Sequence, residues 1–218
     1  MWSFLTSQSK KSHLINQAFE EMSAMLAQDV GLVSSAITCL TAKAPPPDVA
    51  SIEERINSSE RMIRRLILEH LTLNPDHDLS ASLGLLSVVH DVERIGDYAK
   101  SIVEIAGMAP ELNMDTEVGR VIGELSREVP LILQSTLDAF SASDAAIASE
   151  VMARHRVVKE RTDTLLGQVV ADSDSGCESV VLAVVSRYLR RISAHASNVA
   201  SSIVNPLDLV SRNEVGVS

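Results

Sequence analysis

The amino-acid sequence predicts an all-α protein built from six long helices. The chain of 218 residues is 45% hydrophobic but only 3% aromatic. Its core must therefore consist of Leu, Ile, Val, Met and Ala, and these side chains suit close packing between helices. The nine glycines and seven prolines fall mostly between segments of helical periodicity, and no stretch shows the alternation of a strand. These observations together favour the helical class.

Strong helix-ending signals separate the first three segments. Apolar residues at helical spacing, such as Ile15, Phe19 and Met22, define the first one. Pro45-Pro46-Pro47 ends it, and Asp48 is a suitable N-cap for the next helix. Asn74-Pro75-Asp76 forms the following turn. The first three helices are predicted at residues 12–43, 48–73 and 78–107.

The second half of the chain repeats this arrangement. Its fourth helix contains Pro130, which should kink it. Cap signals at 141–144 begin the fifth helix, and the polar turn 172–176 precedes the sixth. The last three helices are predicted at residues 115–142, 144–171 and 178–204. The remainder, 207–218, is predicted to be a mobile tail.

Two segments about a hundred residues apart indicate an internal duplication. Residues 88–103 read VVHDVERIGDYAKSIV, and residues 185–200 read VSRYLRRISAHASNVA. Long helices joined by short turns lie antiparallel to their neighbours. The predicted architecture is two tandem antiparallel three-helix bundles related by pseudo-two-fold symmetry, with one repeat in residues 1–110 and the second in 111–206.

Composition narrows the partners and the compartment. A formal net charge of −10 argues against nucleic acid, whose phosphates require a basic surface. Two cysteines, Cys39 and Cys177, do not make a disulfide framework, so a reducing cytoplasm is the expected compartment. The longest uncharged apolar stretch, 30–42, is too short to span a bilayer. The sequence therefore predicts a cytoplasmic protein without a transmembrane segment.

The first copy of the duplicated segment carries a stripe of ionisable residues. His90, Glu93, Arg94 and Asp97 share one face of a helix, because residues three and four apart lie above one another. Glu93 and Asp97 can direct two carboxylates at one cation such as Mg²⁺, Mn²⁺, Fe or Zn²⁺. A solvated face or a salt-bridge network through Arg94 is the alternative. Gly96 indicates close approach of another backbone.

Glu93-Arg94-Ile95-Gly96-Asp97, followed by Ala99, resembles the ERIGD signature of the PhoU family of phosphate-regulatory proteins. Residues 187–198 resemble the family's second-repeat pattern, R-Y-L-E-R-I-G-D-H-A-T-N. The resemblance covers about residues 8–206. It implies tandem three-helix bundles with metal clusters, completed by carboxylates of the preceding helix. For the first repeat it implies a site of Glu53, Asn57, Glu93 and Asp97.

The second repeat departs from the family pattern at most of the implied ligands. Arg190 and Ala194 replace the two signature carboxylates, and Lys159 replaces the acidic residue four positions before Asp163. We therefore expect no metal there. The basic residues either pair with Asp163 or Glu160 or hold an anion such as phosphate. This basic stripe consists of Arg187, Arg190, Arg191 and His195.

The resemblance implies a non-enzymatic regulator or adaptor of phosphate uptake or phosphate-starvation signalling. Its expected partners are a phosphate transporter subunit, a sensor histidine kinase and further copies of itself, and it would reach a membrane only through them. A helical scaffold that oligomerises without metal is an alternative. A carboxylate-metal enzyme is a weaker one, because it needs Glu-x-x-His pairs, and Gly96 stands three residues after Glu93.

Overall fold

The computed structural model describes residues 13–109, 112–172 and 176–205, and these contain six α-helices and no strand. The predicted all-α class is confirmed, with helix ends within a few residues of the expected ones. The predicted tail at 207–218 and the predicted start of the first helix at 12 lie outside the described residues. So does the predicted boundary between the repeats, 110–111. The helices are α1 (His13–Ala42), α2 (Val49–Leu73), α3 (Leu79–Met108), α4 (Glu117–Ala142), α5 (Ala145–Ala171) and α6 (Cys177–Val204).

Side-chain caps begin three of these helices. Asp48 accepts a hydrogen bond from the backbone N–H of Ser51 (3.2 Å) at the start of α2, as predicted. Thr116 accepts one from the N–H of Gly119 (2.9 Å) before α4. Asp144 caps α5 by accepting from two backbone N–H groups. The helix α4 continues through Pro130 without a break in its assignment.

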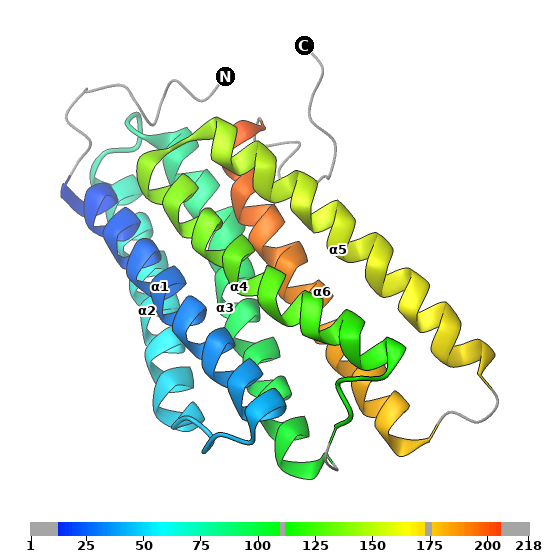
Figure 1. Cartoon of the computed structure of the whole chain (residues 1–218). Coiled ribbons are helices and arrows are strands. Elements are labelled where there is room, and N and C mark those ends of the chain that lie inside the picture. The colour runs from blue at the N-terminus through cyan, green and yellow to red at the C-terminus, as the bar shows by residue number, and fades with distance from the viewer. Residues whose placement is uncertain (1–12, 110–111, 173–175, 206–218) are drawn as a thin grey trace.

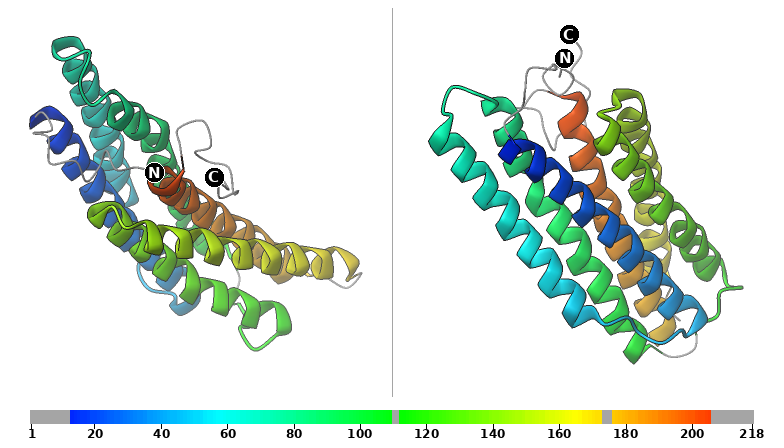
Figure 2. Two further views of the ribbon diagram at one scale, coloured as in Figure 1. Left: turned by 90° about the horizontal axis from the view of Figure 1, so that it is seen from above. Right: turned by 90° about the vertical axis from the view of Figure 1, so that its left-hand side faces the viewer.

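The six helices form two three-helix halves that lie side by side (Figure 1). The helices α1, α2 and α3 pack against one another, and so do α4, α5 and α6. The halves meet where α3 packs on α6 and α1 packs on α4, so α3 and α6 occupy the middle of the molecule (Figure 2). The start of α1 and the end of α6 lie at the same end of the bundle.

One continuous apolar core runs through both halves. It is built almost entirely from aliphatic residues, and Ile95 and Leu189 are fully buried in its centre. Phe19 of α1 and Phe140 of α4 bring two of the few aromatic rings together, with centroids 5.7 Å apart across the interface between the halves. The low aromatic content predicted this kind of interior.

α1 is the one described helix whose length and apolar composition would allow a membrane span, with a mean hydropathy of 1.3 over the relevant window. Half of that window is buried inside the bundle, as expected of a core helix. The sequence prediction considered only the uncharged stretch 30–42 and so missed this longer window. The burial of α1 between α3 and α4 explains why it is so apolar.

Candidate cation site between α2 and α3

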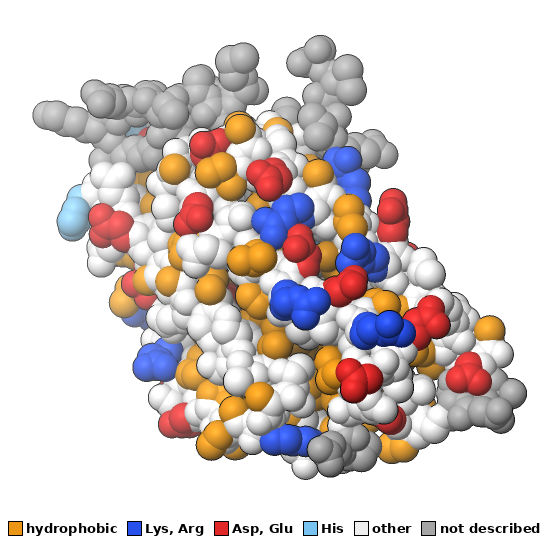
Figure 3. Space-filling view, in the orientation of Figure 1, with side chains coloured by type: hydrophobic (Ala, Val, Ile, Leu, Met, Phe, Trp, Pro, Cys, Tyr) orange, Lys and Arg blue, Asp and Glu red, His pale blue; other side chains and the backbone are white. Residues whose placement is uncertain are grey.

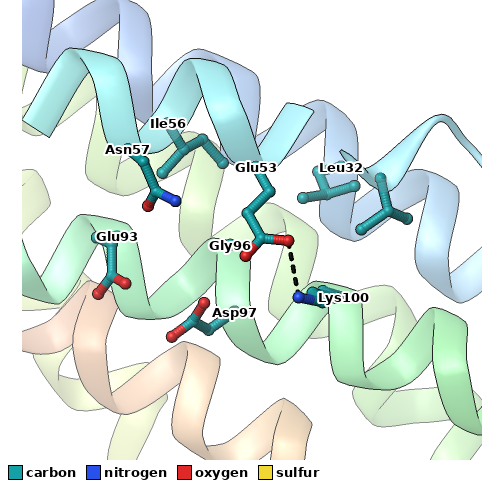
Figure 4. Close-up of a pocket in the computed structure, with 9 residues that line it drawn as sticks. Leu32, Glu53, Ile56, Asn57, Glu93, Gly96, Asp97 and Lys100 are labelled. Carbon is teal, nitrogen blue, oxygen red and sulfur yellow. Dashed lines mark hydrogen bonds and ion pairs between the residues drawn. The ribbon is translucent and has the colours of Figure 1, made fainter. Parts of the chain in front are cut away.

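The four residues implied for the first repeat line one small pocket between α2 and α3. Glu53 and Asn57 come from α2, one turn apart, and Glu93 and Asp97 come from the facing turn of α3 (Figure 4). Because α2 and α3 are antiparallel neighbours, these spacings place all four side chains on facing surfaces. Lys100, one turn beyond Asp97, also lines the pocket.

Two basic side chains neutralise two of these carboxylates. Lys100 Nζ lies 2.7 Å from Glu53 Oε2 and joins α3 to α2. Arg94 forms an ion pair with Asp97 within α3, and its guanidinium also lies over the ring of Tyr98, 5.1 Å from the centroid. The salt-bridge alternative therefore describes part of this site.

Glu93 is less well paired than its neighbours. His90 Nδ1 lies 3.1 Å from Glu93 Oε2, but without hydrogen-bond geometry, and this oxygen is buried without a hydrogen-bond partner. The His90 side chain is 65% exposed. Burial, and then the charge of Asp97, raises the pKa of Glu93.

Asp29 on α1 adds a fourth acidic residue to Glu53, Glu93 and Asp97 at this place. It is fully buried, and neither carboxylate oxygen has a hydrogen-bond partner. Burial raises its pKa well above the usual value, and the charges of Glu93 and Asp97 raise it further. A buried carboxyl without a partner is expensive to ionise, so a cation close to Asp29 would favour its charged form.

Gly96 allows the helices to approach at this point. A Cβ atom here would lie 2.7 Å from Ile56 Cδ1 and 3.1 Å from Asp29 Oδ1. The glycine predicted to permit close approach of a backbone thus makes room for two side chains, one from α2 and one from α1. Asp29 therefore lies directly against the turn of α3 that carries Glu93 and Asp97.

The chemistry of the pocket fits a hard cation. Its metal-ligating atoms are carboxylate and amide oxygens, which Mg²⁺ and Mn²⁺ prefer. Both oxygens of Asp29 and Oε2 of Glu93 accept no hydrogen bond. As the side chains lie, no three acidic, histidine or cysteine groups of the described residues converge closely enough to hold an ion. Glu53 would have to leave Lys100 to join such a site.

The corresponding region of the second repeat is basic and closed by internal contacts. Arg190 on α6 forms an ion pair with Asp163 on α5. Ser193, which stands in place of the signature glycine, donates to the carbonyl of Arg190 (2.9 Å). Its hydroxyl therefore accepts from Nδ1–H of His155 (2.9 Å). Lys159 adds a further positive charge, which helps lower the pKa of His155.

The predicted basic stripe is divided between two neighbours. Arg190 turns to α5, whereas His195 turns to α3, where its Nδ1 lies 2.8 Å from Asp91 Oδ1. Asn198 donates to the same oxygen (2.7 Å). Arg187 is half-buried and Arg191 is exposed. These four residues therefore do not converge on one point.

Comparison with known proteins decides the family. The profile described as "PhoU domain" matches residues 19–106 and again residues 122–203, well over half of the chain. The chain belongs to the PhoU family. Its two matches fall on the two three-helix halves.

Curated relatives carry the same family name. The chain is 29% identical over 212 residues to the Pseudomonas putida "Phosphate-specific transport system accessory protein PhoU homolog", covering 88% of this chain and 82% of that protein. It is 26% identical over 207 residues to the Pseudomonas aeruginosa homologue of the same name, covering 89% and 80%.

Solved PhoU structures share the fold. Superposition on PhoU from Pseudomonas aeruginosa gives a TM-score of 0.76 at 24% identity, covering 88% of this chain and 95% of that one. The phosphate transport system regulatory protein PhoU from Streptococcus pneumoniae also gives 0.76, at 16% identity, covering 94% and 98%. At these identities the likeness establishes the fold alone.

Sequence reasoning missed two residues of this PhoU-family pocket, Asp29 and Lys100. Lys100 continues the stripe of Glu93 and Asp97 by nearly one more turn, so helical spacing could have found it. Asp29 falls on the buried stripe of α1 between Leu26 and Leu32. An acidic residue at a core position was the available signal.

Proposed function

We propose that this PhoU-family chain is a non-enzymatic accessory protein of a phosphate transport system, acting by docking on a transporter subunit or a sensor kinase at the cytoplasmic side of the membrane. The observation that carries the proposal is the family match over both halves, together with the names of its relatives.

The surface supports docking on basic segments of a membrane protein. The chain has a net charge of −10, and cytoplasmic loops of membrane proteins are rich in Lys and Arg. Charge complementarity of this kind speeds association and selects partners. The face over α4 and α5 is mixed in sign (Figure 3), because Arg154–Glu128 and Arg161–Glu124 ion pairs (2.7 and 2.6 Å) join these helices. Docking driven by the net negative charge of the chain would therefore use a face other than the one over α4 and α5.

We further propose that a cation binds only in the first repeat. Glu53, Asn57, Glu93 and Asp97 would hold it, and it would add positive charge to a pocket lined by three carboxylates and one lysine. The second repeat provides its own cation in Arg190, already paired with Asp163, and so has no need of a metal.

Co-purification tests the docking function. The tagged full chain is expressed in its source organism at high and at low phosphate, and bound proteins are identified by mass spectrometry. We expect enrichment of a phosphate transporter subunit or a sensor kinase. A tagged acidic helical protein of similar charge is the control for non-specific capture. Equal recovery of transport and kinase proteins with both baits, at both phosphate levels, would contradict the proposal.

An isosteric variant asks whether the cation matters for docking. Glu93→Gln with Asp97→Asn keeps the size of both side chains but removes their charges. Asp163→Asn makes the same kind of change in the second repeat, outside the proposed site. If the cation organises the docking surface, the first variant loses the partner and the second retains it. If both variants retain the partner, docking is independent of the cation.

A further inference from the structure

We propose that Asp29 is a ligand of the first-repeat cation site, so that the site joins three helices rather than two. The inference rests on the cation site proposed above and adds a residue from α1, outside the signature motif and the helix that precedes it. It begins with an anomaly. Asp29 is the one acidic or basic residue among the buried residues of α1, and neither of its carboxylate oxygens has a hydrogen-bond partner.

The direction of the Asp29 side chain connects it to the site. Its Oδ1 lies against Gly96, at 3.1 Å from the position a Cβ atom would take. Gly96 lines the pocket and lies between Glu93 and Asp97 on α3. The same two carboxylates act on Asp29 electrostatically. An unpartnered buried acceptor therefore faces the turn of α3 that carries the signature carboxylates.

A count of charges shows what is missing. Lys100 neutralises Glu53 and Arg94 neutralises Asp97. Asp29 and Glu93 remain: both oxygens of Asp29 and Oε2 of Glu93 are buried and accept no hydrogen bond, and Glu93 Oε2 lies 3.1 Å from Nδ1 of the largely exposed His90. Two carboxylates that form no ion pair with a lysine or arginine match the charge of one divalent cation. Burying both as ions without it would be costly.

The donor set selects the class of cation. Carboxylates of Asp29, Glu93 and Asp97, with the amide oxygen of Asn57 as a further donor, provide oxygen only. Hard cations that favour such ligands are Mg²⁺ and Mn²⁺, whereas softer metals prefer imidazole or thiolate. Cys39, the buried cysteine of α1, lies almost three turns away from Asp29 along the helix.

A third helix changes what the cation does. A site confined to α2 and α3 would fasten two neighbouring helices, whereas a ligand on α1 also fastens the helix that packs against α4 of the other half. Binding energy available only in the folded arrangement stabilises that arrangement. Cation binding should therefore raise the melting temperature of the chain, and removal of the Asp29 charge should abolish that rise.

The test is Mn²⁺ binding by the full chain after removal of metals with a chelator. Binding is followed by the electron paramagnetic resonance of free Mn²⁺, and melting is followed by circular dichroism. We expect wild type to bind Mn²⁺ and to melt about 5 °C higher or more at 100-fold excess over Kd. Asp29→Asn should weaken binding at least about 10-fold and lose the shift. Asp29→Ser is a second variant in case the amide packs badly.

Controls separate the possible failures. Asp163→Asn, a carboxylate of the second repeat, should bind Mn²⁺ like wild type, and Glu93→Gln with Asp97→Asn should not bind it. If this double variant loses binding while a folded Asp29 variant keeps wild-type affinity, the role of Asp29 is refuted and the cation site stands. If wild type binds no Mn²⁺, the cation site and the role of Asp29 both fail. Neither result alters the co-purification test of docking.

Discussion

His155 on α5 is a buried histidine in the second repeat, and it should make the chain sensitive to acid. The residue is 3% exposed. Burial, with the charges of Arg190, Lys159 and Arg156, lowers its pKa from 6.5 to about 4. In the unfolded chain the ring takes up a proton near pH 6.5, whereas in the folded chain it stays neutral until about pH 4. The unfolded state therefore binds more protons in this window, and stability falls as the pH is lowered through it.

The size of the effect follows from the pKa difference. Each unit corresponds to about 1.4 kcal/mol. The loss should reach about 2 kcal/mol at pH 5 and about 3 kcal/mol below pH 4, and it should vanish above pH 7. A loss of about 2 kcal/mol is a large part of the stability of a typical domain. Ser193 accepts from the neutral ring (2.9 Å), so a glutamine can replace this donor without titrating.

Urea denaturation at pH 7.5 and pH 5 measures this difference. Stability of wild type minus that of His155→Gln should decrease by about 2 kcal/mol between the two pH values, since other titrating groups cancel in the comparison. Val158→Ala, a buried change one turn along α5, should lower stability equally at both. A wild-type-minus-variant difference that stays constant between pH 7.5 and pH 5 would refute the reasoning.

Four further substitutions test packing, the interface between the halves and the site. Gly31→Ala should stabilise α1 by about 0.5–1 kcal/mol, because its Cβ would meet nothing within 4 Å. Gly119→Ala should lower stability by about 1–3 kcal/mol, because its Cβ would lie 2.7 Å from a backbone Cα atom. Urea denaturation measures both changes. Asp91→Ala should cost about 1–3 kcal/mol in the same assay, because two donors of α6 lose their acceptor. Lys100→Met should strengthen Mn²⁺ binding severalfold, because it releases Glu53; unchanged affinity would contradict competition between the ammonium and the cation.

The helical frame was predictable because its signals are local. Prolines, caps such as Asp48 and the spacing of apolar residues each act within a few positions, so the helix ends follow from nearby residues. The internal duplication then indicated how the six helices group. The prediction that Glu53 and Asn57 lie close to Glu93 and Asp97 came from the family resemblance, since no local rule states which turn of α2 faces which turn of α3.

The electrostatic detail of the site was not predictable from the sequence because it depends on contacts between helices. Asp29 is 64 positions from Glu93 in sequence, and only the packing of α1 on α3 brings it to Gly96. Likewise, the basic stripe of α6 was expected either to pair with Asp163 or Glu160 or to hold an anion, and the structure has the pairing of Arg190 with Asp163. Its members separate because Asp163 attracts Arg190 to one side and Asp91 attracts His195 to the other.

The two repeats keep one packing pattern while their charges have opposite signs, and the structure explains how both are possible. Core residues such as Ile95 and Ile192 follow the signature in both copies and are fully buried, so substitutions two positions away leave the core intact. The charged residues near them can then change, provided that each new charged side chain forms an ion pair or a hydrogen bond. Arg190 forms an ion pair with Asp163. Asp29 has no partner for either oxygen within the described chain, and Glu93 Oε2 has only the nearby ring of His90. The cation proposed for the first repeat would add positive charge at these two residues. The pair of Asp91 and His195 joins α3 to α6 two residues before Glu93, so the signature turn of α3 lies next to a contact between the halves.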